Sequence, residues 1–138
     1  MAVHRELGPG LLESIYEDSL AWEMLKKGIT FSRQHAVPVW YDGHQVGDPL
    51  RVDFLVENLL VVEIKAVETL HPVFTAQVLS YLKLLGKPLG LLVNFHSVLM
   101  KDGVHRLMIP GYAGGGHRAI GGNGGNGELP RRTEANGG

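Results

Sequence analysis

The sequence contains no cysteine. This absence excludes a disulfide framework, a thiolate zinc site and a cysteine nucleophile. Long apolar runs are also missing, since the longest, such as residues 58–62, are far too short to span a bilayer. The first residues, Met1-Ala-Val-His-Arg-Glu, lead into no apolar signal-peptide core. We therefore expect a cytoplasmic protein that does not act at a membrane.

A strongly basic balance is missing as well. The formal net charge is −1, and residues 1–110 carry 10 Lys or Arg against 12 Asp or Glu. Proteins that bind nucleic acid strongly and without help are usually basic, so this balance argues against high-affinity binding. It does not exclude a nuclease, because bound metal partly neutralises clustered carboxylates.

Glycine is concentrated at one end of the chain. Of the 19 glycines, 11 fall within the 28 residues 111–138. A segment of this composition cannot bury enough apolar surface to offset its loss of conformational entropy. We predict one folded domain over residues 1–110 and a disordered tail over residues 111–138.

The pattern of apolar residues and breakers predicts a mixed α/β fold. It indicates the element order α-β-β-β-α-β, with helices flanking a mixed central sheet. In the first helix we expect a buried stripe of Leu12, Ile15, Tyr16, Trp22 and Leu25. The predicted helices span residues 11–27 and 72–85, a turn falls at Asp42-Gly43, and the predicted strands cover 29–31, 36–41, 44–46, 50–56, 59–67, 88–95 and 105–109.

Three charged residues interrupt two otherwise apolar strands. If the strands meet at the Glu57-Asn58 turn, residues whose numbers sum to about 116 lie opposite one another. Asp53 then faces Glu63, and Lys65 lies two residues along on the same side. An odd sum would place the two acids on opposite faces of the sheet.

Two facing carboxylates repel each other, and burying both is costly unless a cation compensates. A hard cation such as Mg²⁺ or Mn²⁺ takes its oxygen ligands from carboxylates, a backbone carbonyl, water and phosphate. Lys65 would orient a water or offset transition-state charge. The alternative is that Asp53, Glu63 and Lys65 form a purely structural ion-pair cluster. We favour the metal site because the acids sit in apolar strands and because Gln77 and Tyr81, four apart, share a face of the next helix.

Several motifs resemble one known family. Gly10-Leu11-Leu12-Glu13-Ser14-Ile15-Tyr16 fits the signature of the GxxExxY proteins, and VHRELGPGLLESIYE, VDFLVEN, VVEIKAVE, AQVLSYLKLLG and GLLVNF extend the similarity from Val3 to about Pro110. These are small bacterial proteins of the PD-(D/E)XK nuclease superfamily, so the resemblance implies a restriction-endonuclease-like core for the α/β fold. Family members usually carry a longer first helix before Val3, so we expect this chain to start within it.

The resemblance implies a role for each site residue. Asp53 corresponds to the first acid of the motif, Glu63 and Lys65 to its (D/E)-x-K, and Glu13 to an acid from the first core helix. Asp53, Glu63, the backbone carbonyl of Ile64 and, as a further ligand, Glu13 would bind the metal. Gln77 and Tyr81 resemble a Gln-x-x-x-Tyr motif that contacts substrate in the recombination-exonuclease branch.

The sequence thus favours a Mg²⁺- or Mn²⁺-dependent nuclease that hydrolyses phosphodiester bonds, in DNA rather than RNA. One alternative is a nuclease-fold module that binds nucleic acid or protein without cleaving. Another is a dimeric interaction protein with a structural acid cluster. The weak charge of the domain also leaves room for a homodimer or for a protein partner that delivers substrate.

Overall fold

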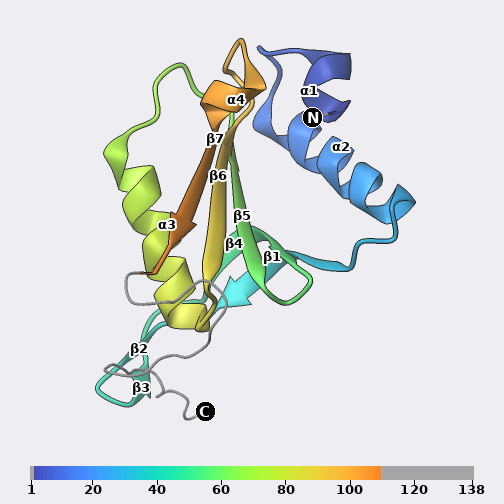
Figure 1. The fold of residues 1–138 in the computed structure, drawn as a ribbon. Coiled ribbons are helices and arrows are strands. Elements are labelled where there is room, and N and C mark those ends of the chain that lie inside the picture. The colour runs from blue at the N-terminus through green and yellow to red at the C-terminus, as the bar shows by residue number, and fades with distance from the viewer. Residues whose placement is uncertain (1, 110–138) are drawn as a thin grey trace.

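The computed structural model describes residues 2–109, and the predicted glycine-rich tail at 111–138 lies outside them. The helices and short strands follow one another along the chain as Figure 1 shows. Their bounds are α1 Ala2–Leu7, α2 Glu13–Lys26, β1 Phe31–Val37, β2 Trp40–Tyr41, β3 His44–Gln45, β4 Leu50–Val56, β5 Leu60–Lys65, α3 Pro72–Leu85, β6 Leu89–Asn94, α4 Met100–Gly103 and β7 Val104–Met108.

Five strands form the central sheet in the order β1-β4-β5-β6-β7. β5 and β6 run parallel, joined through α3, and the other neighbouring pairs are antiparallel. α2 lies against one side of the sheet and α3 against the other (Figure 1). The predicted mixed sheet flanked by helices is confirmed. The strands β2 and β3 form a separate hairpin whose turn residues, Asp42 and Gly43, both have positive φ, as a tight hairpin turn requires.

The core is divided between the two faces of the sheet. The cluster on the α2 side is built around Tyr16, Phe54, Ile64 and Phe95, all with 0% exposure. The cluster on the α3 side contains Val37, Val52, Leu55, Val61, Val78, Leu82 and Leu92. β5 supplies both clusters, because it is the central strand and is covered on both faces.

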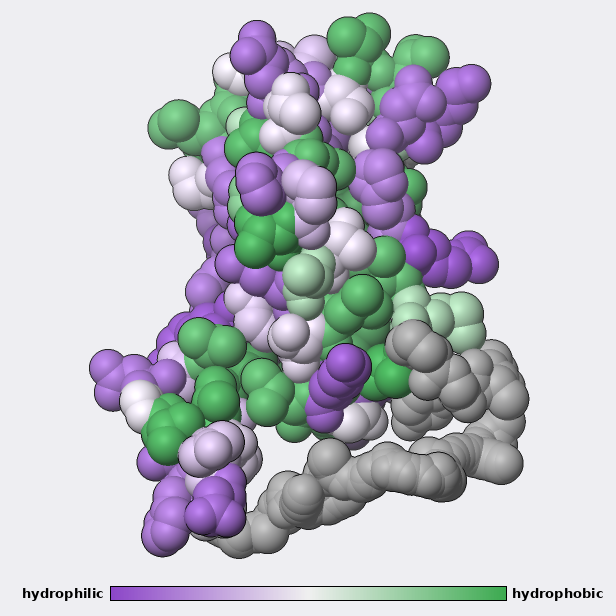
Figure 2. Space-filling view, turned by 90° about the vertical axis from the view of Figure 1, so that its left-hand side faces the viewer, coloured by the Kyte–Doolittle hydropathy of each residue, from purple (hydrophilic) through white to green (hydrophobic). Residues whose placement is uncertain are grey.

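The predicted bounds of α3 are confirmed, and sequence signals explain them. His71 caps the helix by accepting a hydrogen bond from the amide of Val73 at Nδ1, and Pro72 occupies the first turn. Gly86 ends the helix in the left-handed conformation, with φ of 67°. On the face of the molecule seen in Figure 2, apolar and polar residues are interspersed. No helix within residues 2–109 combines the length and apolar character needed to cross a membrane.

The predicted buried stripe of α2 is largely wrong. Of its members only Tyr16 is buried, whereas Leu12 is 74%, Trp22 61% and Leu25 62% exposed, and Ile15 is exposed as well. The face that packs on the sheet is formed by Tyr16, Glu17, Ala21 and Met24. The apolar pattern predicted the wrong buried face of α2, because the actual face includes the carboxylate of Glu17, which bonds to Arg33 and Gln34 on β1.

Other elements also differ from the prediction. The strand expected at 29–31 and the first half of the one expected at 36–41 form a single strand, β1, with the polar residues Arg33 and Gln34 at its centre, while the second half becomes β2. The short helix α4 was not predicted, whereas a helix at the start of the chain, where α1 lies, was expected only from the resemblance. α1 packs on α2, and His4 bonds through Nε2 to the carbonyl of Ser97, just before α4.

Candidate active site

The central sheet splits between β4 and β5. Their register pairs Val56 with Leu60, Leu55 with Val61 and Phe54 with Val62, so the predicted sum of 116 is confirmed. Beyond Phe54 the regular pairing of these two strands ends. β4 nevertheless stays paired with β1 to the end of both strands, and β5 stays paired with β6 as far as Lys65 and Asn94. We call the opening between β4 and β5, at Asp53 and Glu63, the fork.

Two reciprocal hydrogen bonds hold the fork together. The amide of Asp53 donates to Oε1 of Glu63 at 2.7 Å, and the amide of Ile64 donates to Oδ2 of Asp53 at 2.7 Å. Each carboxylate therefore takes the main-chain N–H that a regular ladder would have offered to a carbonyl. The arrangement fixes both acids and brings them close together.

Burial makes it costly to charge both acids. Glu63 is only 7% exposed, and burial, followed by the charge of Asp53, raises the pKa of Glu63 from its ordinary 4.5 to about 7. Burial also raises the pKa of Asp53, against the hydrogen bond from the amide of Ile64, which lowers it. Without a cation, the pair therefore holds a proton well above the pH at which carboxyl groups usually lose theirs.

Lys65 brings a positive charge to this pair. Its Nζ lies 4.5 Å from the ring centroid of Phe74, so the ammonium rests on an aromatic face supplied by α3. The charge of Lys65 lowers the pKa of Glu13, Asp53 and Glu63 alike. The charge of Lys65 therefore acts on all three carboxyl groups at once.

Glu13 approaches the same group from the first turn of α2. Burial of its carboxyl group raises its pKa, Lys65 lowers it, and Asp53 and Glu17 raise it again. The residue as a whole is exposed, in contrast to Glu63. Glu13 thus faces the fork from its solvent side.

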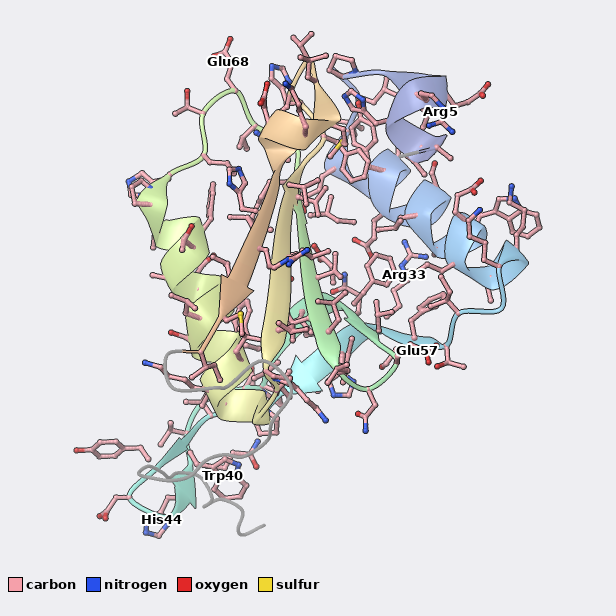
Figure 3. All side chains as sticks on the ribbon, viewed as in Figure 1. Arg5, Arg33, Trp40, His44, Glu57 and Glu68 are labelled. Atoms are coloured by element: carbon pink, nitrogen blue, oxygen red, sulfur yellow. The ribbon has the colours of Figure 1, made fainter. Side chains whose placement is uncertain are left out.

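Sequence reasoning missed Glu17, a second acid one turn along α2. Glu17 is 9% exposed, and its Oε2 accepts hydrogen bonds from Nε of Arg33 at 2.7 Å and from Nε2 of Gln34 at 3.0 Å. Arg33 also pairs with Asp18 and lies between α2 and the sheet (Figure 3). The four-residue spacing of Glu13 and Glu17 is the signal that could have indicated a shared face.

Comparison with known proteins identifies a family for this chain. Residues 1–107 match the family model of the PD-(D/E)XK nuclease superfamily. The chain belongs to this superfamily. A solved alkaline exonuclease from Laribacter hongkongensis has a similar arrangement, with a TM-score of 0.48 and 14% sequence identity over 70% of this chain. The match spans 55% of the length of that exonuclease. No curated protein matches the chain.

In this member of the superfamily, α3 supplies two further polar residues near the fork. Tyr81 is partly buried, and burial first, then the charges of Glu63 and Asp53, raises its pKa. Gln77 lies one turn earlier on α3 and is exposed to solvent. Tyr81 therefore lies close enough to the acids for their charges to act on it, whereas Gln77 is exposed to solvent.

PD-(D/E)XK nucleases generally use divalent metal ions, and the fork offers suitable atoms. Its donors are the carboxylate oxygens of Asp53 and Glu63 and the neighbouring carbonyl of Ile64. Within residues 2–109, no group of three or more His, Cys, Asp or Glu side chains is arranged to hold a metal. The two carboxylates and one carbonyl of the fork fit Mg²⁺, which binds through one or two carboxylates and completes its shell with water and substrate phosphate. They do not fit structural zinc, which prefers four protein ligands.

Proposed function

We propose that this chain is a nuclease that depends on Mg²⁺ or Mn²⁺ and hydrolyses phosphodiester bonds, in DNA rather than in RNA. We further propose that it belongs to the GxxExxY proteins and acts in the bacterial cytoplasm. The observation that carries the proposal is the fork: the buried Glu63 and the half-buried Asp53 are joined by reciprocal main-chain hydrogen bonds, and the charge of Lys65 acts on both. An ordinary structural ion pair would match charges, whereas this group gathers more carboxylates than cations.

The acids have assigned tasks in this proposal. Asp53 and Glu63, with the carbonyl of Ile64, hold the metal. Glu13 becomes a further ligand only by moving towards this pair, since no three acids within residues 2–109 are already arranged around one metal position. When bound, the metal lowers the pKa of a water and stabilises charge on the phosphate oxygens. The main-chain bonds at Asp53 and Ile64 keep both carboxylates aimed before substrate arrives, so little reorganisation is needed during reaction.

Lys65 is the proposed source of positive charge for the reaction. Hydrolysis forms a bond from water oxygen to phosphorus and breaks a phosphorus–oxygen ester bond, while a proton passes to the leaving oxygen. Negative charge grows on the phosphate during this exchange, and the ammonium of Lys65 offsets it or orients the water. Gln77 and Tyr81 bind the substrate along α3.

The GxxExxY signature has a structural purpose that supports this assignment. Gly10 has φ of 101°, and the hydroxyl of Tyr16 donates to the carbonyl of Gly8 at 2.6 Å and accepts from the amide of Leu11 at 3.0 Å. Tyr16 in turn stacks on Phe95, with ring centroids 4.6 Å apart. The signature glycine and tyrosine thereby fix the loop that leads directly into Glu13.

The charge of the domain bears on its partners. Because residues 1–110 carry a small excess of acids, we propose that the chain depends on metal, and on a protein partner or a second copy, to gain affinity for nucleic acid. Such dependence also distinguishes it from a nuclease-fold module that binds without cleaving. A module of that kind would bind nucleic acid in the absence of metal.

The test is cleavage of single-stranded DNA, double-stranded DNA and RNA with Mg²⁺, Mn²⁺ or EDTA. We expect metal-dependent cleavage of DNA that Lys65→Ala lowers by about 100-fold or more. Lys87→Ala is the matched control, since Lys87 bonds to Asn58 at the opposite end of β5. Binding of DNA without cleavage under every metal condition would replace this proposal with the binding module.

A further inference from the structure

Gln34 has an unusual backbone for a residue inside a strand. Its φ is 52°, in the left-handed region, although its neighbours Arg33 and His35 both pair regularly with β4. Gln34 is also the residue opposite Asp53, where the pairing of β1 with β4 is interrupted. A residue with a long side chain adopts this conformation at a cost of about 1–2 kcal/mol, so other contacts must stabilise it.

The side chain of Gln34 connects two carboxylates. Its Nε2 donates to Oε2 of Glu17 at 3.0 Å and to Oδ1 of Asp53 at 3.2 Å. The main-chain carbonyl of Gln34 accepts from Nη1 of Arg51 at 3.0 Å. An amide nitrogen has two N–H groups, and here each one points to a different acid. The bond from Arg33 to Glu17 fixes the outer end of this chain of contacts.

Asp53 is therefore held through both oxygens. Oδ2 accepts from the amide of Ile64, and Oδ1 accepts from Gln34. The first bond ties the carboxylate to β5, and the second sets the rotation of the carboxylate about the Cβ–Cγ bond. A neutral donor is suited to this place, because a cation would compete with the metal and an acid would repel Asp53.

We propose that Gln34 is a positioning residue that aligns the Asp53 carboxylate for metal binding, and that Glu17 and Arg33 orient its amide. This inference rests on the proposed function, since it assigns Asp53 as a metal ligand. The strained backbone at Gln34 is the means by which a residue on β1 reaches both α2 and the fork. Groups that act on a ligand in this way typically contribute 10- to 100-fold to metal affinity, an order of magnitude taken from other sites.

The variant that tests it is Gln34→Gly. Glycine adopts a φ of 52° without strain, so this exchange removes the amide while relieving the backbone. Asn58→Gly is the matched control: Asn58 also has positive φ, at 55°, but lies in the β4–β5 turn, beyond the end of β4 and more than about 10 Å along the strand from Asp53. Gln34→Asn is a second variant, because asparagine tolerates the left-handed backbone but is too short to reach both acids.

Two measurements on the full chain decide the matter. Calorimetric titration with Mn²⁺ should show an affinity about 10- to 100-fold weaker for Gln34→Gly and Gln34→Asn, and unchanged for Asn58→Gly. Hydrogen exchange of the metal-free protein should show the Ile64 amide exchanging about 3- to 10-fold faster than in wild type, with the amide of Val62 unaffected.

Wild-type Mn²⁺ affinity together with a wild-type exchange rate at Ile64 in both variants would overturn the role of Gln34. If the wild-type protein itself binds no Mn²⁺, the proposed function fails instead. Exchange at Ile64 then decides alone whether Gln34 fixes Asp53, because that measurement needs no metal.

Discussion

The raised pKa of Glu63 makes the stability of the metal-free protein depend on pH in an unusual direction. Most carboxyl groups in folded proteins favour folding as pH rises, because their charged form has a partner. Glu63 does the opposite, since burial raises its pKa from 4.5 to about 7. Between pH 4.5 and about 7, Glu63 keeps a proton in the folded protein that it has lost in the unfolded chain. The contribution of Glu63 is therefore intact below pH 4.5 and is lost as pH rises to about 7.

The size of this effect follows from the shift. Each unit of difference corresponds to about 1.4 kcal/mol, so the full interval costs roughly 3 kcal/mol of folding free energy. Asp53, whose pKa is also raised, adds a loss of the same sign. Glu63→Gln removes the titrating group but keeps an oxygen able to accept from the amide of Asp53. The free energy of unfolding of this variant, relative to wild type, should rise by about 3 kcal/mol between pH 4.5 and 7.5.

Urea unfolding in EDTA, followed by circular dichroism at several pH values, measures this difference directly. A difference between wild type and Glu63→Gln that stays constant across the range would refute the argument that burial controls this acid. Mn²⁺ supplies the second half of the assay. At a hundredfold excess over its dissociation constant, it should stabilise wild type at pH 7.5 by about 2.7 kcal/mol and leave Glu63→Gln almost unaffected.

Three further predictions concern other parts of the chain. Phe74→Leu should lower the turnover of DNA cleavage by about 2- to 30-fold, because the ammonium of Lys65 loses its aromatic support, whereas Phe74→Tyr should retain it; equal rates for both would contradict this. Gly90→Ala should destabilise the fold by about 1–3 kcal/mol in urea unfolding, because a Cβ there would lie 2.8 Å from Cγ1 of the buried Val78. Deleting residues 114–138 should leave the melting temperature within a few degrees, and a large drop would show that the tail contributes to the fold.

The sequence was most informative where local signals act alone. The Glu57-Asn58 turn determined the register of β4 and β5, and Pro72 and Gly86 determined the ends of α3. It was least informative where a polar side chain is buried through distant partners. The burial of Glu17 depends on Arg33 and Gln34, which are 16 and 17 residues away, so the hydrophobic pattern placed α2 on the wrong face.

The left-handed backbone of Gln34 illustrates the same limit. Glutamine has no preference for that conformation, and nothing in the neighbouring residues indicates it. The conformation follows from contacts with two acids that come together only in the folded sheet. The interruption of regular pairing at Asp53 has the same origin, so the fork could be located from sequence but its hydrogen bonding could not.

The two bonds that Asp53 accepts have a consequence for genetic experiments. Asparagine is the usual exchange for a catalytic aspartate, but its side chain has one acceptor oxygen, and its NH₂ group would then face either the Ile64 amide or the Gln34 amide, donor against donor. Gln34 can turn its own oxygen towards that group only by giving up Glu17. A strain carrying Asp53→Asn would therefore lose function for two reasons: the contact between β4 and β5 is weakened, and the metal-binding carboxylate is gone. Complementation with Lys65→Ala separates the two, because Lys65 lies outside the hydrogen bonds that close the fork.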